Sequence, residues 1–500
     1  MKKYLEQILC LFLISTSVLA IDSGALDTSF SNDLSTAGWD LIFESGGAVF
    51  ATDTKVDSLG RAVVVGSYRK NGETNYHPFV RRYLANGQLD TSFGNNGLYI
   101  YPLFNDNLDA VKVDISSATN TIFVAYNFIN NSNDFDIAVF YLDSTTTDVL
   151  GLQTIAFDLG ATADRKDDFL AGINVNPIPF SATPDGDVII AAEVERNNAN
   201  DTDFGIAKLN YFETSGTLTF DTFFSSDGLT DCFFDQAGGV GIDKAMTIGT
   251  AANGNYVVGG STFEGNGVDS NGWNASFCEF DKTTGAFTFK WSTLIPGSTA
   301  DDSREFLADF VIYEPQNGIE YLLVLTKEPE MDLSNKFDFA IRRYNRIFSN
   351  GNVWEWEVDT TFGSGPRHIS RVGFVDGLLF PAATDDEPKR ILVETKNQQI
   401  LIAGTSNWTD TNNENFSHMA LAKLNKDGSL NTSWGTNQSG KAYVTLDNSL
   451  PLIFKDSLTS IAQDKKSEKI YISGINIAAG NQVYGSIARV HNDLIFKSGF

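Results

Sequence analysis

The phrase Leu89-Asp90-Thr91-Ser92-Phe93-Gly94 decides the fold, because close copies of it recur along the 500-residue chain. The copies are Leu26–Phe30, Val358–Gly363 and Leu430–Gly435, with a weaker one at Phe220–Phe224. Recurrence of one phrase is typical of folds built from a repeated supersecondary unit. In each copy the Leu and the aromatic residue can pack inward, while the Asp side chain accepts hydrogen bonds from the backbone beyond it. We therefore interpret Asp-Thr-Ser as a structural turn and not as a nucleophile with its acid.

Two further elements precede the phrase. An apolar strand with a basic or polar end comes directly before it, as in Phe79–Tyr83, Phe339–Tyr344 and Met419–Leu424. Ahead of that strand lies a β-branched run that is apolar on both faces, the pattern of a strand buried between neighbouring sheets. The run occurs at Ala62–Gly66, Ile122–Ala125, Val188–Ala192, Tyr256–Gly260, Tyr321–Leu325, Ile400–Gly404 and Ile470–Gly474. Seven copies give a period of about 68 residues, enough for a four-stranded blade with long loops.

The two ends of the chain complement each other. The last repeat stops after Ser486–Val490 without the phrase, and an orphan copy at Leu26–Phe30 stands before the first repeat. A ring closed by an N-terminal strand that joins the last blade explains both ends and leaves no free sheet edge. The sequence thus predicts an all-β fold, a β-propeller of seven four-stranded blades. One blade more or fewer is also compatible, since the second and fourth repeats lack a clean closing phrase.

The repeat resembles the delta-60 repeat family of bacterial exported proteins. The resemblance rests on the phrase, on the Phe-x-Ile-Ala-Arg-Leu-like strand before it and on the small-ended β-branched strand. It is strong at residues 50–97 and 337–435 and weak at 98–335. It implies a propeller-like fold, and it brings no established activity and no catalytic residues.

Charge and the N-terminus bear on the compartment. The chain has 36 Lys and Arg against 63 Asp and Glu, a net charge of −27, which disfavours binding to nucleic acid or anionic lipid. Lys2-Lys3, the apolar run Ile8–Ile14 and the small Ala20 predict a signal peptide over residues 1–20. Residues 21–500 then form a single propeller domain without a transmembrane segment. We expect a monomer that is secreted to the periplasm, the outer surface or the medium.

Cys232 and Cys278 remain after removal of the predicted signal peptide. An even pair in an exported chain can form a disulfide, and two buried thiols are the alternative. Neither these cysteines nor the four histidines have the spacing of a zinc site.

An acidic residue stands on the approach to each β-branched run. These residues are Asp53, Asp109, Asp168, Asp243, Asp302, Asp386 and Asp456. If the blades are equivalent, the carboxylates fall at similar heights and several could converge at one mouth of the central channel, where they would hold Ca²⁺ or a cationic ligand. The alternative is a set of solvated turn carboxylates.

Three tryptophans are candidates for ligand binding. Trp354 and Trp356 flank Glu355, so both rings point to one face of a strand and could stack on a sugar, although packing between blades would use the same spacing. Trp408 lies in a polar loop and is the candidate for an exposed ring. No Gly-x-Ser-x-Gly or His-Glu-x-x-His motif occurs.

These observations favour an exported β-propeller that serves as a binding or interaction module for a protein or carbohydrate at the cell surface. No cofactor other than calcium is suggested. The alternative function is a metal-dependent hydrolase or lyase that uses the channel-mouth carboxylates.

Overall fold

The computed structural model describes residues 19–21, 24–31, 37–103, 110–159, 166–178, 184–196, 201–234, 241–263, 272–293, 305–315, 319–330, 333–349, 353–365, 367–374, 385–394, 396–409, 415–444, 446, 453–478, 481–492 and 495–497. Residues 1–18 of the predicted signal peptide lie outside the described residues. Within these ranges the chain forms β-strands and a 3₁₀ turn, η3 (Thr436–Gln438). The all-β prediction is confirmed. In this part of the chain no helix is long and apolar enough to cross a membrane.

The strands form consecutive antiparallel groups in which chain order and sheet order agree. Group 1 is β3 (Ala48–Val56), β4 (Ala62–Arg69), β5 (His77–Tyr83) and β6 (Leu98–Ile100). Group 2 is β7 (Lys112–Ile115), β8 (Ile122–Ile129), β9 (Phe135–Leu142) and β10 (Val149–Ile155). Group 3 is β11 (Asp168–Pro177), β12 (Gly186–Glu195), β13 (Thr202–Phe212) and β14 (Thr217–Phe220), with β15 (Leu229–Cys232) also on β13. Group 4 is β16 (Asp243–Thr250), β17 (Tyr256–Phe263), β18 (Trp273–Phe280) and β19 (Phe287–Ser292).

The second half of the chain repeats the pattern. Group 5 is β20 (Phe306–Tyr313), β21 (Tyr321–Glu330), β22 (Leu333–Ser349) and β23 (Val353–Val358), with β24 (Ile369–Val372) also on β22. Group 6 is β25 (Asp385–Val393), β26 (Ile400–Thr409), β27 (Asn415–Leu424) and β28 (Lys441–Val444). Group 7 is β29 (Ile453–Gln463), β30 (Ile470–Ala478), β31 (Val483–Val490) and, from the other end of the chain, β2 (Trp39–Ile42). A parallel pair, Ser417 with Lys455, joins groups 6 and 7 into one eight-stranded sheet.

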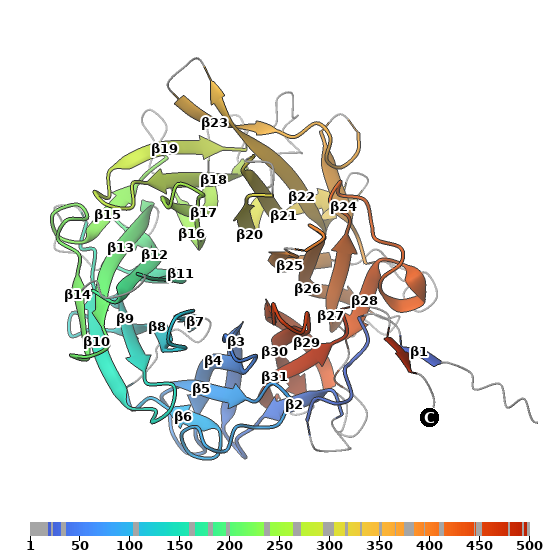
Figure 1. Ribbon diagram of the computed structural model, residues 1–500, viewed down its shortest axis with the longest axis horizontal. Coiled ribbons are helices and arrows are strands. Elements are labelled where there is room, and N and C mark those ends of the chain that lie inside the picture. The colour runs from blue at the N-terminus through green and yellow to red at the C-terminus, as the bar shows by residue number, and fades with distance from the viewer. Residues whose placement is uncertain are drawn as a thin grey trace, which may run out of the picture.

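The groups stand around a common centre, which the first strand of each group faces (Figure 1). We call these strands, β3, β7, β11, β16, β20, β25 and β29, the inner strands. The core lies between neighbouring groups, because each buried cluster combines side chains of two groups, such as Val63 of β4 with Val124 of β8. The β-branched runs are accordingly buried on both faces, with Val63 and Val64 fully inaccessible to solvent. That part of the sequence prediction is confirmed.

The N-terminal segment packs against the end of the chain. Strand β2 pairs with β31 from Trp39 opposite Ala488 to Ile42 opposite Gly485. The backbone N–H of Asp27 donates to the carbonyl of Arg489 at 2.7 Å. The orphan phrase therefore lies on the strand whose own repeat lacks one. A short pair, β1 (Leu19–Ile21) with β32 (Ile495–Lys497), includes Leu19 and Ala20 of the predicted signal peptide and would be lost on its removal.

Candidate functional site

The repeated phrase forms a buried polar joint between groups. Asp90 Oδ1 accepts hydrogen bonds from the backbone N–H and the hydroxyl of Ser92 at 3.2 and 2.5 Å, and Oδ2 accepts from Arg82 Nε at 2.8 Å. The guanidinium of Arg82 lies 4.3 Å from the ring centre of Phe93 and donates to the carbonyl of Ser144 in group 2. One Arg thus holds the turn of its own group and contacts the next group.

The same joint recurs at three other places. A basic side chain on the third strand pairs with the acid of the phrase and donates to a backbone carbonyl of the following group. The sets are Lys208 with Asp221 and the carbonyl of Lys282, Arg343 with Asp359 and the carbonyl of Lys426, and Arg489 with Asp27 and the carbonyl of Ala85. Burial would raise the pKa of Asp27, but the Ser29 hydrogen bonds and the charge of Arg489 lower it to about 2. This geometry is that of a structural turn.

Four of the predicted acidic positions make a second type of joint. Asp168, Asp243, Asp386 and Asp456 lie on inner strands, and each carboxylate accepts a hydrogen bond from a backbone N–H at the end of the preceding group. The donors are Phe157 at 2.7 Å, Phe234 at 2.7 Å, Phe374 at 2.8 Å and Leu446 at 3.3 Å, respectively. In this geometry each of these aspartates joins its own pair of groups.

Asp109 and Asp302 lie outside the described residues. Among the described residues no group of three or more His, Cys, Asp or Glu is placed to hold a metal ion. Burial raises the pKa of Asp168 to about 8, which favours a neutral acid, a poor ligand for Ca²⁺, at pH 7. Calcium binding at these positions stays a prediction.

Asp53 lies in a different environment, directly after an irregularity that recurs in the inner strands. In six of them the pairing register shifts by one residue, leaving Thr52, Ala171, Met246, Ala308, Lys389 and Thr459 as bulges. The residues that follow the bulges are Asp53, Gly172, Thr247, Asp309, Arg390 and Ser460. In group 2 the residue at this position is Lys112. The residue after it, Val113, donates its backbone N–H to Asp53 Oδ2 of group 1 at 3.1 Å. Bulges bend a strand and redirect its side chains.

Two cavities lie where these residues meet. The larger has a volume of about 480 Å³, and five of the bulge residues line it, Thr52, Met246, Ala308, Lys389 and Thr459. The smaller has about 190 Å³, and the residues that follow the bulges line it. Lys112 and Arg390 line both cavities, and residues from inner strands of several groups contribute to each. We call the larger one the central cavity.

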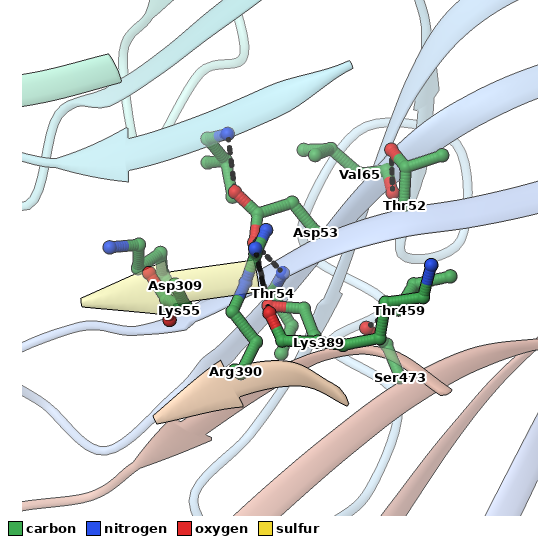
Figure 2. A network of polar contacts seen from close by, with 12 residues as sticks. Thr52, Asp53, Thr54, Lys55, Val65, Asp309, Lys389, Arg390, Thr459 and Ser473 are labelled. Carbon is green, nitrogen blue, oxygen red and sulfur yellow. Dashed lines mark hydrogen bonds and ion pairs between the residues drawn. The ribbon is translucent and has the colours of Figure 1, made fainter. Parts of the chain in front are cut away.

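Charges of both signs meet beside the central cavity. Figure 2 shows Arg390 reaching toward Asp53, with Asp309 and Lys55 nearby. Arg390 Nη2 lies 3.9 Å from Asp53 Oδ1, and that carboxylate also accepts from Thr54 N at 2.9 Å and Ser460 Oγ at 2.7 Å. Burial would raise the pKa of Asp53, but the charges of Arg390 and Lys112 lower it. Burial, together with the positive charge of Arg390, lowers the pKa of Lys112 to about 8.

The predicted aromatic and cysteine positions are placed as follows. Trp356 on β23 is 8 % exposed and packs in the cluster between groups 4 and 5, with the Arg346 guanidinium 5.6 Å from its ring centre. This environment agrees with the packing alternative. The side chains of Trp354 and Trp408 lie outside the described residues. The prediction of a polar loop at Trp408 is wrong, because its backbone belongs to β26 and pairs with Phe416 of β27. A disulfide joins Cys232 on β15 to Cys278 on β18 and thus links groups 3 and 4.

The sequence prediction missed Lys112 and Arg390. A signal for them exists in a four-residue pattern of the inner strands. The pattern consists of an apolar residue, the bulge residue, a variable residue and a branched or aromatic residue, in that order. Examples are Leu170-Ala-Gly-Ile, Leu307-Ala-Asp-Phe and Leu458-Thr-Ser-Ile. Aligning these segments places Lys112 and Arg390 at the variable position.

Comparison with known proteins supports the architecture. The family described as "Domain of unknown function (DUF5122) beta-propeller" matches residues 60–93 and 399–433. No curated protein matches the sequence. Among solved structures the chain is similar to the polysaccharide lyase Uly1 (12 % identity, 89 % of this chain and 90 % of that one, TM-score 0.44). It is also similar to the β-propeller domain of the Trilobed protease from Pyrococcus furiosus (8 %, 92 % and 98 %, 0.41) and to Trypanosoma rangeli sialidase with the inhibitor DANA (10 %, 79 % and 56 %, 0.37). The family match and the strand groups together show an all-β protein that carries β-propeller repeats.

Proposed function

We propose that this chain is an exported, seven-bladed β-propeller of the delta-60 repeat type that binds a ligand in its central cavity. In this proposal each strand group is one blade, and the N-terminal segment with β2 completes the last blade. Export is supported by the basic and apolar N-terminus and by the disulfide between Cys232 and Cys278, since such bonds persist in oxidising compartments.

Contacts between the last and first groups support a closed ring. Ser460 Oγ on β29 donates to Asp53 Oδ1 on β3, and Thr459 Oγ1 donates to the carbonyl of Ala51 at 2.8 Å. Tyr471 and Ile487 of group 7 share a buried cluster with Val64 of group 1. These contacts have the same character as those between groups that follow each other in the chain.

The central cavity is the observation that carries the binding function. Its volume of about 480 Å³ is in the range of small-molecule sites, and the bulges that shape it are frequent next to functional sites. The hydroxyls of Thr52 and Thr459 donate to backbone carbonyls, of Val111 and Ala51. The two threonine hydroxyls are therefore engaged as donors within the protein. Among the residues that line the cavity there is no histidine or cysteine.

A glycan array probed with the purified protein tests this function, with Met246→Trp as the variant that fills the cavity. Met246 is partly exposed in the cavity, so the larger ring has room to enter it. Phe223→Trp is the control, because Phe223 is 84 % exposed and does not line the cavity. We expect glycan binding that Met246→Trp abolishes and Phe223→Trp retains. Binding that both variants retain would place the ligand elsewhere, and the absence of any binding would contradict a carbohydrate ligand.

A further inference from the structure

The central cavity is positively charged in a strongly acidic protein. The chain as a whole has a net charge of −27. The side chains that line this cavity include four cations, Lys112, Lys327, Lys389 and Arg390, and one carboxylate, Glu387. A local excess of positive charge against such a background concentrates anions at the cavity and repels cations.

Two of the four cations are already neutralised by close partners. Lys389 Nζ lies 2.5 Å from Glu387 Oε1, and Lys327 Nζ lies 3.6 Å from Asp385 Oδ1. These pairs sit at the rim, where the Lys389 and Glu387 side chains are 35 % and 43 % exposed. They therefore add little net charge to the cavity.

Lys112 and Arg390 are less well compensated. Within the part of the chain that the structure describes, no ion pair is formed by Lys112. The nearest carboxylate to Arg390 is that of Asp53, at 3.9 Å, and it already accepts hydrogen bonds from Thr54, Val113 and Ser460. Two cations that repel each other thus face the central cavity, whereas the two carboxylates that attract them, those of Asp53 and Asp309, line the smaller cavity beside it.

We propose that the central cavity binds a small organic carboxylate, the class that includes acidic sugars, through Lys112 Nζ and the Arg390 guanidinium. This inference rests on the proposed function and names the chemical class of its ligand. An ammonium and a guanidinium are the side chains that bind carboxylates best, the latter with two parallel N–H donors. Phe306, Leu307 and Pro388 supply the apolar wall for a carbon skeleton, which an inorganic anion would leave uncovered.

The lowered pKa of Lys112 agrees with this assignment. Burial and the charge of Arg390 both oppose protonation of Lys112 in the free protein. A bound carboxylate would offset both effects, so the unfavourable charge of the free site becomes favourable in the complex.

Calorimetric titration of the full chain at pH 7 and constant ionic strength tests the proposal. The probes are D-glucuronate, D-galacturonate and citrate, with D-glucose, D-galactose and inorganic sulfate for comparison. We expect at least one carboxylate to bind at least about tenfold more tightly than its neutral counterpart and than sulfate, the ratio that one charge-assisted hydrogen bond provides. Sulfate binding as tightly would overturn the organic part of the proposal, and no binding by any carboxylate would overturn it entirely.

Lys112→Met separates a ligand-binding lysine from a structural one. We expect it to weaken carboxylate binding at least about tenfold and to leave the melting temperature of the free protein equal or higher, because it removes a buried, poorly compensated charge. Lys396→Met is the matched control, since Lys396 is 80 % exposed and lies outside the cavity. Undiminished binding in Lys112→Met, or a lower melting temperature, contradicts the assignment.

The two proposals fail in different ways. If neutral glycans bind and Met246→Trp abolishes their binding, the cavity is a ligand site and only the preference for carboxylates is wrong. If neither neutral nor acidic probes respond to Met246→Trp, the proposed function fails as well.

Discussion

The joints that the repeated phrase forms between groups, which we call the outer joints, contain the same types of charged residue as the inner strands. The roles of these residues differ between the two regions. At the outer joints Arg82, Arg343 and Arg489 each meet an Asp of the phrase and a backbone carbonyl of the next group. At the centre Arg390 and Lys112 face the central cavity, while the carboxylates of Asp53 and Asp309 line the smaller one beside it. In four groups the outer joint pairs Arg or Lys with an Asp of the phrase, whereas the position after each bulge holds a different type of residue in most groups. The recurring pair fits a structural role, and the varied position fits a binding site.

Removing an outer cation should have the largest effect. Arg489→Met removes the shortest ion pair of the buried Asp27, leaves it Lys469 Nζ at 3.4 Å, and removes the hydrogen bond to the carbonyl of Ala85. Arg489 is fully buried. Breaking a buried pair of this kind costs about 3–5 kcal/mol in the free energy of unfolding, which urea denaturation would measure.

Lys396→Met, at an exposed ion pair with Glu468, is the control and should cost less than about 1 kcal/mol. Equal effects of the two substitutions would show that the outer joint does not contribute as its geometry indicates.

A second prediction compares two carboxylates with opposite pKa shifts. Burial raises the pKa of Asp168 to about 8 in the folded protein, so the folded state binds a proton that the unfolded state releases. This contribution to stability is present below about pH 4 and is lost as the pH rises through about 8. Asp27, with its pKa of about 2, contributes stability that is present above about pH 4 and is lost only as the pH falls toward 2.

Asp168→Asn keeps an oxygen for the N–H of Phe157 and removes the ionisation. We expect the variant to be more stable than the wild type at pH 9 by at least about 1 kcal/mol and to lose less stability between pH 5 and pH 9. Parallel pH profiles of the two proteins in urea denaturation would contradict the raised pKa.

The smallest expected effect concerns calcium. Among the described residues no three acidic, His or Cys side chains are grouped to hold a metal ion, so we expect the melting temperature in excess EDTA and in millimolar Ca²⁺ to agree within about 1 °C. A ligand at about a hundred times its Kd adds about 2.7 kcal/mol, so a real site would raise the melting temperature measurably. Such a rise would favour the alternative function, a metal-dependent hydrolase or lyase.

The contrast between the two regions also explains what the sequence could predict. The strands and the phrase at Asp90 could be predicted because the same residue pattern recurs along the chain. Asp168 was found for the same reason, but a position along a strand does not tell which neighbour its carboxylate meets. The bulges at Thr52 and Lys389 are a property of two paired strands and leave little trace in either alone. Lys112 and Arg390 went unnoticed because they differ from their counterparts in other repeats.

The pairing of Asp27 with Arg489 has a consequence for synthesis. These residues are 462 positions apart, and the N-terminal phrase is made long before the strand that it completes. Closing so long a loop carries an entropic cost that contacts elsewhere in the ring must offset first. A chain that stops short of β31 leaves the Asp27 carboxylate without its guanidinium and strand β2 without its pairing partner. The last group can therefore be completed only after the chain has been made through β31.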